Sequence, residues 1–495
     1  MLPLLFFFFW ANLKDMSFVF YNTLGRSRQD FQPLEKGKVG FYGCGPTVYN
    51  YAHIGNLRAY ILHDTLVRAL RRGGYEVNHV MNITDVGHLS GDSDHGEDKM
   101  VKSAEEKGKS VLEIADYYTK AFFNDTDKMN ILRPSVVCKA TEHIPQMIEI
   151  IRRIEEKGCT YFSGGNLYFD ISQFPNYGEL ALLRLDEQGH TRTGVDENKR
   201  NPQDFVLWFT KSKFESRALV WDSPWGRGYP GWHIECSAMS MEHLGEQFDI
   251  HAGGIDHIPV HHTNEIAQSE TAFGKRPWVK YWLHNEFLIL DKGKMSKSTG
   301  GFVTLQNLAD EGFDPLDYRY FLLGGHYRSQ LNFSHESLQG AKSSRKSLMD
   351  KIRSLDSGAA GAGAAGGAEI PAGSAAEKRL KAFDAAMQDD LSTPRALAEL
   401  WGLLKDDSPP AQTLAAVFQM DEVLGLSLES AYNEQKKDCE NLDSGFAEEV
   451  QKLIDRRAQA KKAKDFAQAD GIRLELKERG VILEDRAEGT VWRRV

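Results

Sequence analysis

Residues 38–82 carry the pattern that most narrows the choice of fold: a strand, a turn, a helix and a second strand in close succession. Lys38–Cys44 (KVGFYGC) is a short apolar run typical of a buried strand, and a Gly/Pro-containing turn follows it. A helical pattern of apolar residues begins near Gly55 and stops at Gly73, the first of two glycines. Val77–Asn82 then has the character of the next strand. This βαβ unit predicts a parallel sheet, because parallel neighbours need a crossover connection.

The remainder of the chain divides by composition. Residues near 115–230 mix helical runs such as Ile144–Lys157 with strand-like runs such as Asn166–Phe169, which indicates an insertion. Parallel-strand character returns at Gln247–His251 and Trp282–Leu290. Fifteen of the twenty residues in 357–376 are Gly or Ala, a composition typical of a flexible linker. We therefore expect an N-terminal extension at 1–15, an α/β domain at 16–340 that contains the insertion, a helical domain at 341–430 that contains the linker, and a C-terminal module at 446–495.

Charge and cysteine content exclude several classes of protein. The 495 residues have a net charge of −10 and are 41% apolar, which is ordinary for a globular chain and excludes a wholly disordered one. No run of about 20 apolar residues is present to span a bilayer. Five scattered cysteines do not form a disulfide framework and fit a reducing cytosol. Nucleic acid would have to bind a local basic surface, for which Arg456–Lys464 (RRAQAKKAK) is a candidate unless it is simply a solvated helix face.

The first ten residues, MLPLLFFFFW, are almost entirely apolar. We expect residues 1–15 to be a start-site artefact, with Met16 as the true first residue, or a disordered tail. A targeting peptide is the less favoured alternative, because neither a basic leading segment nor a small-residue cleavage site is evident.

The segment from His53 to Asn56 (HIGN) lies at the predicted turn from strand to helix. Unpaired N–H groups and the positive end of the dipole at a helix N-terminus favour phosphate binding. Gly55 would let a nucleotide approach the backbone, and His53 could donate a hydrogen bond to it. The alternative is an ordinary capped helix, because four residues make a weak motif.

A second motif, Lys294–Ser298 (KMSKS), is flanked by glycines on both sides. Its two lysines could offset charge that develops on a phosphate during transfer. A lysine-rich exposed turn is the alternative. The occurrence of HIGN and then KMSKS about 240 residues later, on a βαβ framework, favours the interpretation as a phosphate site.

Histidine, cysteine and glutamate gather in and around residues 231–265, which hold six of the sixteen histidines. His261 and Glu265 are four residues apart and so share one helix face, while Cys236 precedes them and Cys44 lies shortly before His53. Two thiolates, an imidazole and a carboxylate suit Zn²⁺. The alternative is that the cysteines pack as small apolar residues and that the His–Glu pair is only a hydrogen bond.

Together these motifs resemble those of a known family. HIGN followed by KMSKS is similar to the paired signatures of class I aminoacyl-tRNA synthetases. Similarity to the cysteinyl-tRNA synthetase family extends from about Met16 to Val495 and rests on FYGCGPTVYNYAHIGN, GWHIECSAMS, PVHHTNEIAQSE, FLLGGHYRSQLNFS and the ending GTVWRRV. The resemblance implies a doubly wound, Rossmann-like α/β catalytic domain with an insertion, then an α-helical tRNA-contacting domain and a small anticodon-binding module.

The resemblance also implies roles for individual residues. The implied zinc ligands are Cys44, Cys236, His261 and Glu265, and the implied cysteine pocket consists of Thr84, Trp232, His251 and Asp256. The implied catalytic residues are His53, Asn56, Lys294 and Lys297, which bind ATP together with Gly55. The implied anticodon contacts are Lys461, Phe466, Asp470 and Asp485, although an aromatic residue at position 466 is otherwise typical of a helix core. Two features depart from the family pattern: Asn56 replaces the last histidine of the HIGH signature, and the loop after Thr84 is long.

The function implied by the resemblance is ATP-dependent attachment of L-cysteine to tRNA(Cys). One Zn²⁺ per chain would recognise the cysteine thiolate, and Mg²⁺ would accompany ATP. The resemblance further implies a cytoplasmic monomer that does not contact a membrane. Two alternatives are a ligase that joins cysteine to an amino sugar, which the C-terminal module disfavours, and a non-catalytic RNA-binding paralogue, which the intact motifs disfavour.

Overall fold

A computed structural model describes residues 17–86, 99–183, 197–211, 219–290, 303–355, 368–440, 444–486 and 489–494. The extension at 1–15, both lysines of the KMSKS segment and most of the Gly/Ala-rich stretch lie outside these ranges. Within the described ranges, no helix is both long and apolar enough to cross a membrane.

The centre of the molecule is a five-stranded parallel sheet with the order β11-β10-β3-β4-β5. Chain order runs outward in both directions from β3, so β3 and β10 flank the topological switch point of a doubly wound sheet. The predicted Rossmann-like α/β class is therefore confirmed. The strands are β3 (Lys38–Gly43), β4 (Glu76–Ile83), β5 (Val136–Lys139), β10 (Phe248–Gly254) and β11 (Val279–Asn285).

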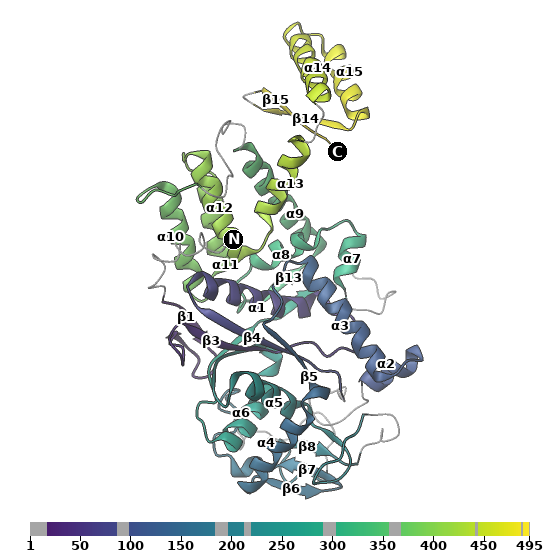
Figure 1. Cartoon of the computed structure of the whole chain (residues 1–495), viewed down its shortest axis with the longest axis vertical. Coiled ribbons are helices and arrows are strands. Elements are labelled where there is room, and N and C mark those ends of the chain that lie inside the picture. The colour runs from purple at the N-terminus through teal and green to yellow at the C-terminus, as the bar shows by residue number, and fades with distance from the viewer. Residues whose placement is uncertain are drawn as a thin grey trace, which may run out of the picture.

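Helices cover both faces of this sheet (Figure 1). Successive side chains of β3 point to opposite faces of the sheet, and both faces are buried. Phe41 lies in the core shared with α1, and its neighbour Tyr42 lies in the core shared with α4, α5 and α6. The helices of this domain are α1 (Ile54–Arg72), α2 (Lys99–Lys107), α3 (Val111–Lys128), α4 (Ile144–Glu156), α5 (Trp232–Leu244) and α6 (His261–Phe273).

A separate four-stranded antiparallel sheet lies within the segment expected to be an insertion. Its strands are β6 (Thr160–Ser163), β7 (Asn166–Phe169), β8 (Phe205–Phe209) and β9 (Tyr229–Pro230). The segment near 115–230 also contains β5, which pairs in parallel with β4. The first part of that segment thus belongs to the central sheet, and the second sheet begins at Thr160.

Two short strand pairs complete the α/β region. β1 (Val19–Asn22) and β2 (Ser27–Asp30) form a hairpin beside β11, and β12 (Leu288–Leu290) pairs in parallel with β13 (Leu331–Phe333). The strand character predicted at Trp282–Leu290 is confirmed, but it divides between two strands, because β11 ends at Asn285 and β12 joins a different sheet.

A helical region follows the α/β region and packs onto α1. Residues 404–409 separate α11 from α12, and another break follows α10, where Asp390 and Leu391 have φ of 58° and 53°. A further helix, α13, runs from the end of the domain expected at 341–430 toward the module expected at 446–495, and its Leu428 and Tyr432 are buried. The helices are α7 (Leu305–Asp310), α8 (Pro315–Leu323), α9 (His335–Ser354), α10 (Ala375–Gln388), α11 (Thr393–Leu403), α12 (Pro410–Leu424) and α13 (Leu428–Glu440).

Arg319 of α8 connects the helical region to the α/β region. Its guanidinium is fully buried, pairs with Asp64 of α1 at 2.5 Å and donates to the backbone carbonyl oxygens of Met129, Asn130 and Leu424. One side chain thus bonds α1, the end of α3 and the end of α12.

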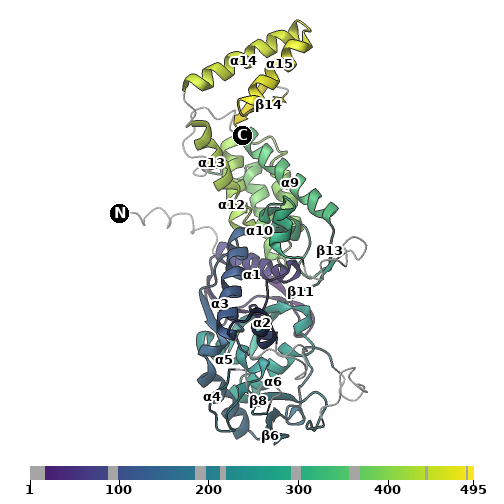
Figure 2. The same ribbon diagram turned by 90° about the vertical axis from the view of Figure 1, so that its right-hand side faces the viewer.

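The C-terminal module has a small core of its own, built from residues that include Val450, Ile472, Leu476 and Val481. It comprises α14 (Ser444–Lys462), α15 (Phe466–Glu478) and the antiparallel pair β14 (Val481–Arg486) and β15 (Gly489–Arg494). Figure 2 shows it at one end of an elongated molecule, with the helical region between it and the α/β region.

Candidate functional site

A cleft of about 470 Å³ opens at the carboxyl ends of β3, β4 and β10. This is the switch point of the sheet, where doubly wound folds bind ligands. Nine residues singled out from the sequence line it: Cys44, His53, Gly55, Asn56, Thr84, Trp232, Cys236, Asp256 and His261. His251 and Glu265 do not line the cleft but are fully buried beside it and bond to each other at 2.9 Å.

The N-terminus of α1 forms one wall of the cleft. His53 is the N-cap: its Nδ1 accepts from the Asn56 N–H, and the Asn56 Oδ1 accepts from the His53 N–H, each at 3.2 Å. Burial lowers the pKa of His53, so its imidazole is neutral at pH 7. A side chain at Gly55 would meet the His53 ring at 3.0 Å, which explains the glycine. The capped-helix interpretation is thus correct, and it leaves the positive end of α1 facing the cleft.

The start of α1 is also bonded to the chain that follows the KMSKS segment. The Ile54 N–H donates to the Val303 carbonyl oxygen at 2.8 Å, and His53 forms an isolated bridge with Thr304. Lys294 and Lys297 lie outside the described residues. The described chain before this segment ends next to the cleft: Leu288 lines the cleft, and β12 ends two residues later at Leu290.

A buried group of metal-binding side chains lies at the base of the cleft. One donor atom from each of Cys44, His261, His262 and Glu265 lies within 4.8 Å of the others. Cys236 of α5 lines the same cleft and shares a thiol–thiol hydrogen bond with Cys44. The structure therefore groups three of the four sequence-predicted ligands, Cys44, His261 and Glu265, and adds His262, which the sequence analysis did not single out. The fourth, Cys236, lines the same cleft but is not a member of this group.

The charges of this group suit a bound cation. Burial alone would raise the pKa of the Cys44 thiol, but the bond to Cys236 and the His262 and His251 imidazoles hold it well below its usual range. Burial would also raise the pKa of Glu265, yet nearby His261 and His251 lower it to about 2. A thiol with a lowered pKa and a carboxylate are thus buried beside imidazoles, a donor set that fits Zn²⁺.

A chain of hydrogen bonds leads away from Cys44 through the interior. Its Sγ lies 3.3 Å from His262 Nε2, His262 Nδ1 lies 2.7 Å from His284 Nε2, and His284 Nδ1 lies 2.8 Å from Thr23 Oγ1. All four side chains are buried. The bond from His284 orients the His262 ring, as hydrogen-bond partners outside the ligand set do for histidines at metal sites. The adjacent pair His261-His262 was a sequence signal for this role, but nothing in the sequence pointed to Thr23.

The residues predicted to form a cysteine pocket surround this base. The Trp232 ring stacks on His261 with centroids 4.1 Å apart, and His251 stacks on Trp282 at 4.7 Å. Thr84 donates to Glu235, a fully buried carboxyl group whose pKa burial raises well above its usual value. Asp256 is exposed at the cleft.

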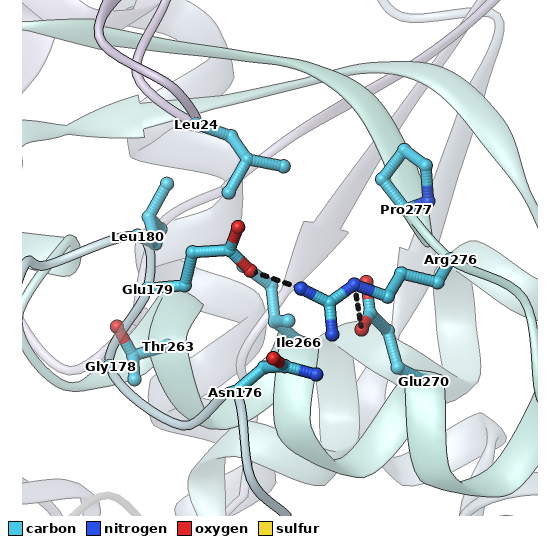
Figure 3. A pocket seen from close by; sticks show the side chains of 10 residues that line it. All are labelled: Leu24, Asn176, Gly178, Glu179, Leu180, Thr263, Ile266, Glu270, Arg276 and Pro277. Carbon is cyan, nitrogen blue, oxygen red and sulfur yellow. Dashed lines mark hydrogen bonds and ion pairs between the residues drawn. The ribbon is translucent and has the colours of Figure 1, made fainter.

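A second hollow of about 180 Å³ is lined by Thr263, Ile266 and Glu270 of α6 together with residues that include Glu179 and Arg276 (Figure 3). Arg276 fills part of it, at 2.6 Å from Glu179 and 3.9 Å from Glu270. The Arg276 cation in this hollow is already paired with carboxylates, and the metal-binding group found among the described residues lies at the first cleft. The first cleft is therefore the candidate for chemistry.

In the C-terminal module, the predicted anticodon residues fall into two groups. Lys461 and Asp485 bond to each other at 2.8 Å, and Arg457 holds the same carboxylate through two bonds of 2.6 and 2.8 Å. Phe466 and Asp470 are exposed on α15, with 64% of Phe466 accessible. The helix-core alternative for Phe466 is therefore excluded.

Two family models match the chain. The model described as "tRNA synthetases class I (C) catalytic domain" matches residues 30–343, and the model described as "Cysteinyl-tRNA ligase anticodon binding domain" matches residues 443–493.

Curated relatives match along nearly the whole chain. A Cysteine--tRNA ligase of Treponema denticola is 58% identical, covering 97% of this chain and 100% of its own length. Proteins of the same name from Treponema pallidum and Borreliella burgdorferi are 47% and 46% identical, each covering 96% of this chain and 99% of its own length. A solved structure of Mycobacterium tuberculosis methionyl-tRNA synthetase with methionyl-adenylate has a TM-score of 0.55 at 15% identity, covering 79% of this chain and 90% of that one, and so supports the fold alone.

Proposed function

Because the chain belongs to the cysteinyl-tRNA synthetase family of class I synthetases, we propose that it attaches L-cysteine to tRNA(Cys) in two steps. The observation that carries this proposal is the cleft itself. It combines a helix N-terminus that suits phosphate with a buried group of metal-binding side chains, and a metal held there would suit a sulfur ligand.

In the first step, the cysteine carboxylate attacks the α-phosphorus of ATP, cysteinyl-adenylate forms and pyrophosphate leaves. The positive end of α1 faces the phosphates, and Gly55 keeps the backbone accessible to them. Lys294 and Lys297 offset the negative charge that develops on the leaving pyrophosphate, and Mg²⁺ accompanies ATP. Positioning and charge stabilisation dominate, because the displacement requires little acid–base chemistry from the protein.

In the second step, a hydroxyl of the terminal adenosine of tRNA attacks the carbonyl carbon of the adenylate, and AMP leaves. The C-terminal module reads the anticodon through exposed groups, among which Phe466 offers a ring for base stacking. Asp485 contributes mainly by holding Arg457 and Lys461 in place.

Cys44, Cys236, His261 and Glu265 would hold Zn²⁺ at the base of the cleft. When bound, zinc supplies a soft cation that distinguishes the thiolate of cysteine from the hydroxyl of serine. Thr84, Trp232 and His251 enclose the side chain, and the exposed carboxylate of Asp256 binds the amino group. Shape alone separates near-isosteres by only about 1–3 kcal/mol, so the metal is the main source of selectivity.

Three measurements on the purified protein test this proposal. It should catalyse cysteine-dependent pyrophosphate exchange, charge tRNA(Cys), and contain one zinc per chain by elemental analysis. Serine should support exchange far more weakly than cysteine. Exchange without tRNA charging, combined with transfer to an amino sugar, would establish the alternative ligase, and active protein without stoichiometric zinc would exclude the metal.

With Co²⁺ in place of zinc, a sulfur-to-metal charge-transfer band should intensify when cysteine is added and stay unchanged with serine. If cysteine leaves that spectrum as serine does while the cobalt protein remains active, the metal has a structural role and does not read the substrate.

A further inference from the structure

Two tyrosines at the rim of the cleft expose their rings to solvent. Tyr51 precedes α1 and lines the cleft, and Tyr117 lies on α3. Each is nearly half exposed, at 46% and 47%. Their hydroxyl oxygens are 2.6 Å apart and their ring centroids 6.1 Å apart, with 73° between the ring planes, so the two rings form an edge-to-face pair that offers ring faces in two directions.

This pair is rigid although it is exposed. Tyr118, buried beneath it, meets the edge of each ring with centroids 5.1 Å apart. Tyr118 belongs in turn to a small core with Val48 and Ile114. Because both rings are already fixed, a ligand that stacks on them loses little side-chain entropy on binding.

Cationic side chains accompany the rings. The Lys109 ammonium lies 5.3 Å from the centre of the Tyr117 ring, and the Lys107 ammonium lies 4.6 Å from that of Tyr118. The nearby carboxylate of Asp116 is paired with Lys139 at 2.9 Å. Exposed aromatic faces flanked by lysines are typical of surfaces that bind single-stranded nucleic acid.

We propose that Tyr51 and Tyr117 form a stacking platform for the unpaired bases at the 3′ end of tRNA. The platform is continuous with the cleft, through which the terminal adenosine must enter, and it combines ring faces for bases with ammonium groups for phosphates. This inference rests on the proposed tRNA-charging activity. The competing interpretation is a structural clasp in which the bond between the two hydroxyls merely fastens α3 to the loop before α1.

Substitutions at Tyr117 separate these two interpretations, because this residue lies outside the lining of the cleft. Tyr117→Phe removes the bond to Tyr51 but keeps the ring, whereas Tyr117→Ala removes both. We expect Tyr117→Ala to lower kcat/KM for tRNA charging by about 10- to 100-fold, the loss typical of one base–aromatic stack. Tyr117→Phe should charge within about threefold of the wild type. Leu112→Ala, at an equally exposed apolar residue on the same helix, is the matched control and should have no effect.

Pyrophosphate exchange and a trimmed tRNA complete the test. Exchange should stay within about twofold in all three variants, because adenylate formation needs no tRNA. For binding of tRNA that lacks its unpaired 3′ nucleotides, the wild type and Tyr117→Ala should be equal. Equal losses in the Phe and Ala variants would establish the clasp, and undiminished charging by Tyr117→Ala would overturn the platform. Failure of the wild type to charge tRNA would instead refute the proposed function.

Discussion

Replacing His284 with phenylalanine should weaken zinc binding although His284 is not among the proposed ligands. The His284 ring lies parallel to Trp282, with 4° between the planes, and phenylalanine can preserve that packing. It cannot preserve the bonds from Nε2 to His262 at 2.7 Å and from Nδ1 to Thr23 at 2.8 Å. The His262 ring beside Cys44 would then lose the contact that orients it.

The expected size of the effect follows from the bond between His284 and His262, because His262 lies in the donor group with Cys44 and His284 is its outer partner. Loss of an outer hydrogen-bond partner at a metal site typically lowers affinity by about 10–100-fold, which corresponds to about 1.4–2.7 kcal/mol. Part of the cost will fall on folding, because His262 Nδ1 and Thr23 Oγ1 are both buried and a buried polar group without a partner costs about 1–3 kcal/mol. Two further variants test the series of hydrogen bonds in steps. His284→Gln introduces an amide that can donate or accept, and Thr23→Val removes only the bond farthest from Cys44.

The assay is competition for zinc against a chelator of known affinity, run on variants first shown to unfold cooperatively. We expect zinc affinity to fall in the order wild type, Thr23→Val, His284→Gln, His284→Phe. A folded His284→Phe protein that binds zinc within about twofold of the wild type would refute the reasoning, because the hydrogen-bond chain would then have no influence on the metal.

Three further outcomes are expected. Phe466→Leu should lower tRNA charging by about 10-fold, the loss of one stacked base, while leaving pyrophosphate exchange unchanged; equal charging would remove Phe466 from the anticodon contacts. A chain ending at Glu440, which keeps the buried residues of α13, should still catalyse exchange but lose most charging; full charging by it would contradict the role of the C-terminal module. Arg319→Met should lower the free energy of unfolding by about 3–5 kcal/mol in a denaturant titration, because it leaves the buried Asp64 carboxylate with Arg68 as its remaining cation; a loss below about 1 kcal/mol would show that the pair does not hold the two regions together.

Local periodicity explains what the sequence could predict. The strand ending at Gly43, the helix from Ile54 and the strand from Glu76 follow from residue spacing and from glycine stops, all of which act over a few residues. Asn166–Phe169 was predicted with its observed bounds. Cys44, Cys236, His261 and Glu265 could be grouped because the motifs that carry them resemble a family. The structure brings Cys44, His261 and Glu265 into one donor group and places Cys236 in the lining of the same cleft.

What the sequence could not predict depends on contacts between distant segments. Leu288–Leu290 is as apolar as the strand before it, and only its pairing with β13 assigns it to another sheet. Thr23 and His284 meet across 261 positions of sequence, with no local pattern to link them. Tyr117 gave no signal, because an exposed aromatic residue on a helix gains meaning only from what stands beside it.

The bond between Ile54 and Val303 also bears on how the protein is made. The two residues are about 250 positions apart in the sequence. The second edge of the central strand β3 likewise stays unpaired until β10 has been synthesised. At roughly 5–20 residues per second on the ribosome, the start of α1 emerges about 12–50 s before the segment that completes its wall of the cleft. During that interval the backbone N–H and C=O groups along one edge of β3 have no partner strand, and such unpaired edges are prone to aggregate. The nascent chain is therefore most prone to aggregation when its first two hundred residues have left the ribosome and its nucleotide site has not yet formed.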